Sequence, residues 1–510
     1  MIALFLLFSV ASLLWLRLNK APPNWDDAWY LSNSLQLYDS WTDGGLLAFA
    51  RHFLAALGFK APLISALPLP FYWIFGRRWH AAYLVNIVAM AVLFAAVWAI
   101  GRRLRNHRTG VIAVYIAGTM PLMYGLSRWY LVEYPLAAAV AAAFWLALVA
   151  SEAQGWLGPC LFGLVCGAGM LLKADFPVFI APAAAWLLVR RRADGRGAPS
   201  VTPILTTSVA IAAPVILLAG PWYILHWRAT LQNALSAGFG RSALIQGTGA
   251  ILSLPALFKY LAIVMDRGLS LYYVALVAAC ALAVAGRRDF PAFRQMAWLL
   301  LWLAPFVVFA FGGNKDVRYI APILPAFAIG AACLLDSAAG NRRWMAAAAL
   351  AFPLISLSAI SFGWPYEAAD KGYALRYDPY SWRQDEILTV IADGALFPHA
   401  GRKLLLLGTD RALFNADNFQ LSAVQDRLPL RVETTAYGES LDELVSQARA
   451  AEYFVYKEGG EAESGFFNTH GLELRTILQQ SREWIEIPFG RGLPDGGTAH
   501  ILRRTALVGN

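Results

Sequence analysis

The sequence predicts a polytopic α-helical membrane protein of about eleven transmembrane helices, followed by a soluble α/β domain. Three observations predict this fold class. The 510-residue chain is 58% hydrophobic and only 15% charged, which is typical of membrane proteins. The first 365 residues contain repeated apolar stretches long enough to cross a hydrocarbon core of about 30 Å. From Lys403 onward, short strand-like and helix-like patterns alternate instead.

Eleven apolar stretches have the length of a membrane-spanning helix. They run approximately over residues 2–18, 80–100, 109–127, 134–151, 156–172, 175–190, 203–225, 266–286, 295–311, 318–337 and 343–362. Residues 61–76 form a twelfth candidate, but Pro62, Pro68 and Pro70 each remove a backbone donor that lipid cannot replace. We expect this stretch to be a re-entrant or juxtamembrane helix that does not span.

The distribution of positive charge predicts the orientation, because Lys and Arg accumulate in short cytoplasmic loops. With eleven spans and a cytoplasmic amino terminus, the inside loops include the arginine-rich segments 101–110, 190–197, 285–290 and 340–344. The site-bearing face and the carboxyl-terminal domain then lie outside, on the periplasmic face of the inner membrane. These loops account for much of the net charge of +9, so we expect no nucleic-acid partner.

Two domains follow from this topology, a membrane domain over 1–365 and an exported α/β domain over 366–510. The membrane domain has two exported loops. In the first, 19–79, the spacing of apolar residues suits a helix lying on the membrane surface. The second, 226–265, contains GFGRSALIQGTGA, which fits either a mobile loop over a site or a plain connector.

The exported domain is predicted from its alternation of strands and helices. The segments are KLLLLG, NADNFQLSAVQDR, LRVETTAY, SLDELVSQARAA, EYFVYK, a polar helix near 466–480, WIEIPF and HILRR. The segment LGTDRALF follows a strand but lacks a glycine-rich phosphate loop, so nucleotide binding is not expected.

Acidic residues beside the membrane are the first candidates for chemistry. Asp26 and Asp27 follow the first span, and Glu133 lies where the third span ends and the fourth begins. Helix capping and solvation at the interface are the alternative roles. The predicted topology places both sites on the exported face. Two acids that converge there can deprotonate an acceptor hydroxyl, or Asp26 and Glu133 can hold a divalent cation.

Basic residues form the complementary set. Four are predicted at exported helix ends: Lys60, Lys173, Lys315 and Arg318. A single basic residue there often extends its charge to the interface, but a phosphate at the membrane surface needs such ammonium and guanidinium groups. Arg128 is a further candidate, with simple pairing to Glu133 as the alternative, since the two lie close in sequence.

These residues lie in motifs that resemble those of the GT-C glycosyltransferases that use lipid-phosphate sugars. The likeness covers roughly residues 1–365 and is greatest to bacterial relatives of protein O-mannosyltransferases and to the lipid A aminoarabinose transferase. NWDDAWYLSNS resembles the first exported acidic motif, in which Asp26 matches the catalytic Asp. KAPLISALPLPFYWIFG, RWYLVEYPL, MLLKADFP and KDVRYIAPILP resemble four further motifs in the same order. Glu133 stands where an Asp is more usual, and Trp29 where the aminoarabinose transferase carries Arg.

The resemblance implies a GT-C fold and a membrane-bound enzyme. The reaction would be an inverting transfer of a sugar from a polyprenyl-phosphate donor, such as an undecaprenyl phosphate sugar, to a glycolipid, polysaccharide or protein acceptor. Asp26 would be the base or a ligand of Mg, Mn, Ca or Zn, with Glu133 as its partner. The donor phosphate would be bound by Lys60, Lys173, Lys315, Arg318 and Tyr319.

A secondary transporter or a flippase of lipid-linked sugars is the alternative. A transporter normally has internal repeats and polar or broken helices near the bilayer midplane, whereas the polar residues here lie at the outer helix ends. A flippase leaves the Asp26 motif and the large exported domain together unexplained.

Overall fold

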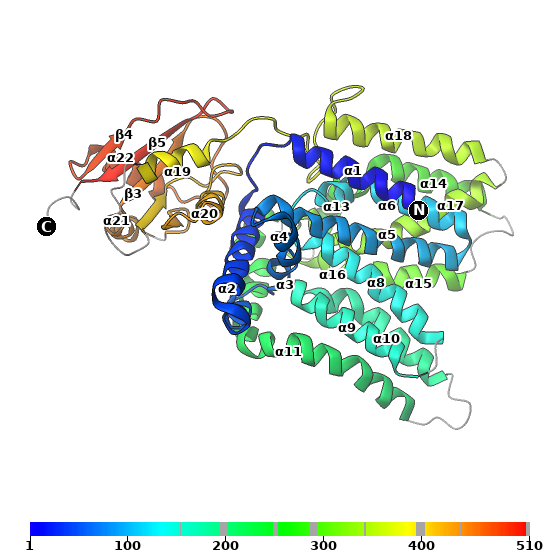
Figure 1. Cartoon of the computed structure of the whole chain (residues 1–510). Coiled ribbons are helices and arrows are strands. Elements are labelled where there is room, and N and C mark those ends of the chain that lie inside the picture. The colour runs from blue at the N-terminus through cyan, green and yellow to red at the C-terminus, as the bar shows by residue number, and fades with distance from the viewer. Residues whose placement is uncertain are drawn as a thin grey trace. The chain divides into compact units, whose positions relative to one another are not determined.

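The computed structural model describes residues 1–152, 155–193, 202–247, 253–285, 293–340, 343–393, 403–438 and 440–505. The chain forms two compact units (Figure 1). The helical unit comprises Met1–Leu16, Ala50–Leu67 and Tyr83–Arg376. The α/β unit comprises Arg17–Phe49, Pro68–Ala82 and Tyr377–Asn510. These bounds differ from those of the two predicted domains, 1–365 and 366–510. The α/β unit also includes two segments near the amino terminus, Arg17–Phe49 and Pro68–Ala82.

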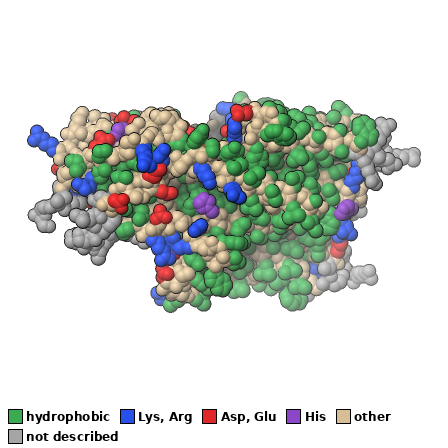
Figure 2. Space-filling model, turned by 45° about the horizontal axis from the view of Figure 1, so that its top comes forward, with side chains coloured by type: hydrophobic (Ala, Val, Ile, Leu, Met, Phe, Trp, Pro, Cys, Tyr) green, Lys and Arg blue, Asp and Glu red, His purple; other side chains and the backbone are tan. Residues whose placement is uncertain are grey.

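Helices occupy all eleven stretches for which membrane-spanning helices are predicted. The helices of the helical unit, in these stretches and between them, are α1 (Ile2–Leu18), α3 (Leu63–Ala66), α5 (Leu84–Leu104), α6 (His107–Thr119), α7 (Pro121–Leu126), α8 (Glu133–Glu152), α9 (Leu157–Leu172), α10 (Phe176–Ala193), α11 (Thr202–Phe239), α12 (Arg241–Gln246), α13 (Leu254–Ile263), η2 (Val264–Leu269), α14 (Leu271–Val284), α15 (Phe293–Leu303), α16 (Phe306–Phe311), η3 (Val317–Ile323), α17 (Leu324–Ala339) and α18 (Arg343–Phe362). Hydrophobic side chains cover much of the visible face of this unit (Figure 2).

Several of these helices are long and apolar enough to cross a membrane. Among the described residues they are Trp79–Leu104, Glu133–Glu152, Ile204–Ile245, Val317–Ala339 and Trp344–Phe362. A sixth is formed if Leu254–Leu269 and Leu271–Val284, which are bent by 95°, make one span. Shorter apolar helices occupy other predicted spans, including Ile2–Leu18, Leu157–Leu172 and Ala297–Phe311. The prolines divide residues 61–76 into α3 and α4 (Leu69–Phe75), with α4 beginning directly after Pro68.

Close packing of small residues holds neighbouring helices together. A Cβ atom on Gly163 of α9 would lie 2.4 Å from the carbonyl oxygen of Ile211 on α11. A Cβ atom on Gly110 of α6 would lie 2.6 Å from the carbonyl oxygen of Trp98 on α5. Helices that approach this closely are typical of membrane bundles, where lipid gives no hydrophobic driving force between helices. Gly163 and Gly110 are therefore positions where larger residues force the helices apart.

One predicted connecting region, 226–265, is more helical than the sequence suggested. Residues 226–239, at the start of the expected loop, continue α11, because no glycine or proline interrupts the sequence from Trp222 to Ala237. Residues 248–252 of the glycine-containing segment lie outside the described residues. So do parts of the arginine-rich loops 190–197, 285–290 and 340–344.

The α/β unit confirms the predicted soluble domain. Its sheet has the strand order β2-β1-β3-β5-β4, in which β1 is parallel to β2 and β3, and β5 is antiparallel to β3 and β4. The strands are β1 (Lys403–Leu407), β2 (Leu430–Thr434), β3 (Tyr453–Glu458), β4 (Trp484–Ile487) and β5 (Thr498–Arg504). The helices are α19 (Gln384–Asp393), α20 (Ala416–Gln425), α21 (Leu441–Ala450) and α22 (His470–Gln480).

Alternating side chains along the strands build a core on each face of this sheet, as the period of two in a strand requires. Leu405 and Val455 point into a cluster that includes Phe419 of α20. Leu406 and Phe454, their neighbours in sequence, point into a second cluster on the other face. The sheet therefore buries both of its faces.

The surface helix expected in residues 19–79 is α2 (Trp25–Ala55), which contains non-helical backbone at Gly45, with φ at 70°. Glycine adopts this left-handed conformation without the steric cost that a side chain brings. The bounds of the α/β unit fall four residues later, after Phe49. The part of α2 that carries Asp26 and Asp27 therefore belongs to the α/β unit.

Candidate functional site

Glu133 is the first residue of α8 and lies at the centre of a buried charged cluster in the helical unit. The residue is 2% exposed. The connection before α8 is fixed by Asn86, whose amide donates hydrogen bonds to the carbonyls of Ser127 (3.2 Å) and Trp129 (2.7 Å). An acid in the first turn is stabilised by the positive end of the helix dipole, so α8 favours Glu133 as a carboxylate.

Lys173 is the first partner of Glu133. It ends α9 with extended backbone, and its Nζ lies 3.1 Å from Glu133 Oε1 and 3.2 Å from Asp175 Oδ2. The same ammonium lies 4.3 Å from the centroid of the Tyr319 ring. Burial lowers the pKa of Lys173, but Asp175 and Glu133 together raise it by more, and the pKa lies above its ordinary value. Lys173 is therefore charged at neutral pH. Glu133, Asp175 and the Tyr319 ring lie around its ammonium, which has three N–H donors.

Arg318 is the second partner and comes from η3. Its Nε lies 3.0 Å from Asp316 Oδ2 and 3.8 Å from Glu133 Oε1. Asp316 caps η3 by accepting a hydrogen bond of 3.1 Å from the backbone N–H of Arg318. Three segments far apart in sequence, RWYLVEYPL, MLLKADFP and KDVRYIAPILP, thus meet at Glu133.

Three residues of this cluster were not among the predicted site residues. Asp175 and Asp316 lie inside the quoted motifs, which could have drawn attention to them. Tyr373 lies in a segment without a motif, and its hydroxyl donates to both oxygens of Asp316 at 2.9 and 3.1 Å. The indole of Trp129 donates to the Tyr373 carbonyl at 2.9 Å. Tyr373 thereby links the segment after α18 to the start of η3.

Both cations of the cluster are paired with carboxylates. Glu133, Asp175 and Asp316 supply three carboxylates, whereas Lys173 and Arg318 supply two cations. These two of the predicted phosphate ligands therefore already have carboxylate partners. The arrangement fixes the Glu133 carboxylate firmly, because a buried charge is stable only when it is paired.

The other two predicted exported cations lie at nearby helix ends. Lys315 donates from Nζ to the carbonyls of Phe309, at 3.3 Å, and Ala310 at the end of α16. Burial lowers the pKa of Lys315. Lys60 has its ammonium 5.8 Å from the ring centroid of Phe59. The residue after Lys60, Ala61, shares a hydrophobic cluster with Leu171, which places Lys60 near the end of α9.

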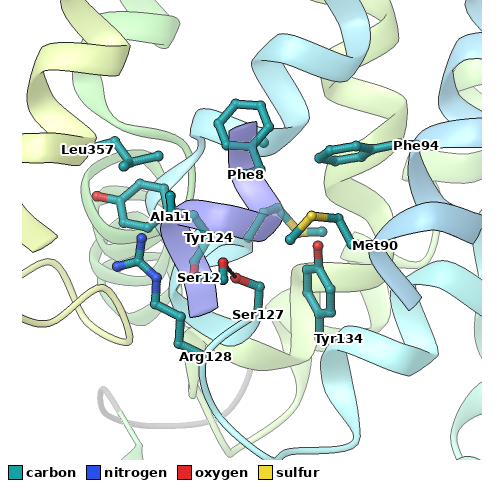
Figure 3. Close-up of a pocket in the computed structure, with 12 residues that line it drawn as sticks. Phe8, Ala11, Ser12, Met90, Phe94, Tyr124, Ser127, Arg128, Tyr134 and Leu357 are labelled. Atoms are coloured by element: carbon teal, nitrogen blue, oxygen red, sulfur yellow. Dashed lines mark hydrogen bonds between the residues drawn. The ribbon is translucent and has the colours of Figure 1, made fainter. Parts of the chain in front are cut away.

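Arg128 does not show the predicted pairing with Glu133 among its described contacts. Its Nη1 donates to Ser361 Oγ at 2.6 Å, and its side chain is 3% exposed. Aromatic rings surround its guanidinium, with centroids 5.3 to 5.8 Å away, from Trp15, Tyr124 and Phe362. Figure 3 shows it lining a small pocket with Tyr124 and the hydrogen-bonded pair Ser12 and Ser127. Its contacts tie α1, α7 and α18 together.

Asp26 and Asp27 lie in the first turn of α2 in the α/β unit. Asp26 is half-buried, whereas Asp27 is 2% exposed. Of the two, Asp26 is the carboxylate with access to a ligand. Its predicted convergence with Glu133 stays a prediction.

The contacts of Glu133 do not favour a metal ion at its Oε1 atom, and the metal site of Asp26 and Glu133 stays a prediction. Among the residues that the structure describes, no group of three or more His, Cys, Asp or Glu side chains is arranged to hold one. The Oε1 atom of Glu133 faces Lys173 and Arg318, and their positive charges oppose a divalent cation at this oxygen.

Comparisons with known proteins agree with the predicted fold. Residues 60–222 match the model of the dolichyl-phosphate-mannose-protein mannosyltransferase family. No curated protein sequence matches the chain. ArnT from Cupriavidus metallidurans, solved with undecaprenyl phosphate, is similar in structure with a TM-score of 0.61 at 13% identity, over 99% of each chain.

Two further solved structures are similar. The Archaeoglobus fulgidus oligosaccharyltransferase in its apo form has a TM-score of 0.52 at 14% identity, over 89% of this chain and 69% of its own. The arabinofuranosyltransferase AftD from Mycobacteria has a TM-score of 0.57 at 13% identity, over 98% of this chain and 40% of its own. These likenesses confirm the predicted GT-C fold. The archaeal enzyme has also been solved with Zn and sulfate. That structure has a TM-score of 0.50 at 15% identity, over 88% of this chain and 67% of its own.

Proposed function

We propose that this chain is a membrane glycosyltransferase that moves a sugar from a polyprenyl-phosphate donor to a glycolipid, polysaccharide or protein of the cell envelope. The buried cluster around Glu133 carries the proposal, because three motifs of the resembled family supply it within a GT-C fold. The likeness to a structure bound to undecaprenyl phosphate supports the donor class.

The proposed reaction is an inverting displacement. Asp26 takes the proton of an acceptor hydroxyl, whose oxygen attacks the anomeric carbon of the donor sugar. The bond from that carbon to the phosphate oxygen breaks, and polyprenyl phosphate leaves with the electron pair. Arg318 offsets the negative charge on the leaving phosphate, and its guanidinium has five N–H donors with which to do so. Asp316 and Glu133 hold Arg318 in place.

Release of polyprenyl phosphate by the purified protein tests the proposal. We expect release from a lipid-linked sugar in the presence of an envelope extract, together with a glycosylated product. A transporter or flippase would move the lipid-linked sugar across a liposome membrane and release no polyprenyl phosphate. That outcome would contradict the proposed reaction.

Arg318→Ala is expected to weaken the binding of undecaprenyl phosphate by about ten- to a hundredfold, because one charge-assisted contact of about 1.5–3 kcal/mol is lost. Titration of the detergent-purified protein measures this affinity. Arg108→Ala is the matched control, since Arg108 pairs with Asp336 and has no proposed contact with the donor. An unchanged affinity in Arg318→Ala would leave this residue only a structural role.

We also propose that the protein is a multi-pass inner-membrane protein whose α/β unit faces the periplasm. The exposed residues Asp43, His107 and Arg482 are suited to single-cysteine labelling in a background without the four native cysteines. We expect an impermeant thiol reagent to label positions 43 and 482 in intact cells, and position 107 only after the membrane is opened. Labelling of position 107 alone in intact cells would reverse the orientation.

A further inference from the structure

The segment that carries Asp26 is held by the carboxyl-terminal part of the α/β unit at several points before α2 begins. The backbone N–H of Lys20 donates to the carbonyl of Asp378 at 2.6 Å. In return, the N–H of Asp378 donates to Asn19 Oδ1 at 2.9 Å. Ala21 packs against the hydrophobic cluster on the α20 face of the sheet. The chain therefore enters α2 from a position that the carboxyl-terminal sheet fixes.

Trp25, the residue before Asp26, makes the most direct of these contacts. Its indole Nε1 donates to Asp410 Oδ1 at 2.7 Å. Asp410 follows β1 and is 4% exposed, and its other oxygen accepts from the hydroxyl of Ser464. Both carboxylate oxygens are therefore engaged, one of them by the first residue of α2. An indole that donates to a buried carboxylate forms a strong, directional contact.

A buried charged network fixes Asp410 in turn. The backbone N–H of Asp410 donates to Glu463 Oε2 at 2.8 Å. The other oxygen of Glu463 lies 2.6 Å from Arg475 Nη2 and 3.3 Å from Arg411 Nε. Arg475 also donates to the carbonyl of Gly408 at the end of β1. Asp410 is therefore held by the segment after β3 and by α22, and not only by its own loop.

The position of this network in the sheet is one where functional groups are common in α/β proteins. It lies at the carboxyl ends of the parallel strands β1 and β3, where the chain leaves the two strands in opposite directions along the sheet. In open α/β sheets this is the crevice where ligands bind. In this chain the carboxylates of Asp410 and Glu463 lie at that end of the strands, and the indole of Trp25 contacts Asp410 there.

A second contact fixes α2 further along. Arg77 binds both carboxylate oxygens of Asp39, with Nη2 to Oδ2 at 2.6 Å, and donates to the carbonyls of Val424 and Gln425 at 2.9 Å. These carbonyls belong to the end of α20. Two contacts along one helix define its direction as well as its position, so the first turn of α2 is oriented by the carboxyl-terminal elements.

We propose that Asp410 is a positioning residue for Asp26, acting through the indole of Trp25. Residues 377–510 of the α/β unit then take part in glycosyl transfer by orienting the carboxylate that removes the acceptor proton, although they supply no reacting group. This inference rests on the proposed function, in which Asp26 is the base. Small displacements of such a group are costly, since an error of about 1 Å lowers a rate by about a hundredfold.

Trp25→Phe and Asp410→Ala test the inference, because each removes one side of the hydrogen bond. We expect kcat for polyprenyl phosphate release to fall about ten- to a hundredfold, with the donor KM within about twofold of the parent protein. Asp410→Asn keeps an acceptor oxygen for the indole and is expected to retain most of the activity. Unchanged kcat in both Trp25→Phe and Asp410→Ala would overturn the inference.

Asp495→Ala controls for a general loss of stability in the same unit. Asp495 pairs with the buried Lys457 and touches neither Trp25 nor Asp410 in the described contacts. We expect it to lower the midpoint of thermal unfolding with little change in kcat for the folded protein. An equal fall in kcat in Asp495→Ala would mean that Asp410 has only a structural role.

The double variants separate this inference from the proposed function. If Asp410 acts through Asp26, Asp410→Ala is expected to cause no further loss in an Asp26→Asn background. A further tenfold loss there would overturn the positioning role. Normal activity of Asp26→Asn alone would instead contradict the proposed mechanism. Loss of activity in Asp26→Asn with normal activity in Asp410→Ala would remove only the inference.

Discussion

Asp26→Asn is expected to lower turnover by at least about a hundredfold, the low end for loss of proton-transfer catalysis, while the protein folds and inserts normally. The change keeps the shape of the side chain and its ability to accept hydrogen bonds at the start of α2, but removes the negative charge. If Asp26 serves only to cap the helix, Asn does so nearly as well and activity survives. The two roles therefore predict different activities for the same folded variant.

Release of polyprenyl phosphate by purified variants in nanodiscs measures the effect, with thermal unfolding recorded in parallel. Asp27→Asn is the internal control. Asp27 is 2% exposed and Asp26 is half-buried, so only Asp26 is open to an acceptor, and we expect the Asp27 variant to lose less turnover. Near-normal release by Asp26→Asn would remove the proposed mechanism even though the fold is confirmed.

The fold was predictable because its signals are local. Apolar stretches and prolines along the first 365 residues predict where helices begin and end, and the strands of the sheet follow from alternating segments such as EYFVYK. The end of α9 at Lys173 and the start of α8 at Glu133 follow in the same way. The predicted topology alone is enough to place Glu133 and Lys173 at helix ends on the same side of the membrane domain.

The pairing within the site was not predictable to the same degree. The sequence marks Lys173 and Arg318 as cations, but not that Asp175 and Asp316 already neutralise them. That depends on side-chain directions where the helices end. No pattern in the sequence points to Tyr373, because its hydroxyl contacts Asp316 from a segment that has neither periodicity nor a motif.

The membership of α2 in the α/β unit was beyond sequence reasoning for a different reason. The contact from Trp25 to Asp410 joins residues 385 positions apart, and no local pattern encodes such a pairing. It also changes how the carboxyl-terminal domain should be tested. Truncation at about residue 365 would remove Asp410 and the α20 carbonyls that hold α2, so loss of activity would not distinguish catalysis from positioning. Point variants make that distinction.

Lys173→Met is expected to cause the largest loss of stability in the helical unit. The ammonium lies 3.1 Å from Glu133 and 3.2 Å from Asp175, and its loss leaves two carboxylates without their shared cation. Removing one partner from a buried ion pair costs about 3–5 kcal/mol, because the remaining charge stays desolvated. Since the folded pKa of Lys173 lies above its ordinary value, the contribution is fully present at neutral pH. It is lost only as the pH rises through that raised value.

Thermal unfolding of the purified variants in one detergent measures this loss. Lys315→Met is the matched control, because the Lys315 ammonium donates to the Phe309 and Ala310 carbonyls, which are neutral, and we expect a smaller decrease. Adding Glu133→Gln to Lys173→Met is expected to restore part of the stability, since it removes one of the two carboxylates that have lost the Lys173 ammonium. An unfolding midpoint for Lys173→Met equal to that of the parent protein would mean that Glu133 and Asp175 are not held by this ion pair, and that Lys173 is available to the donor phosphate.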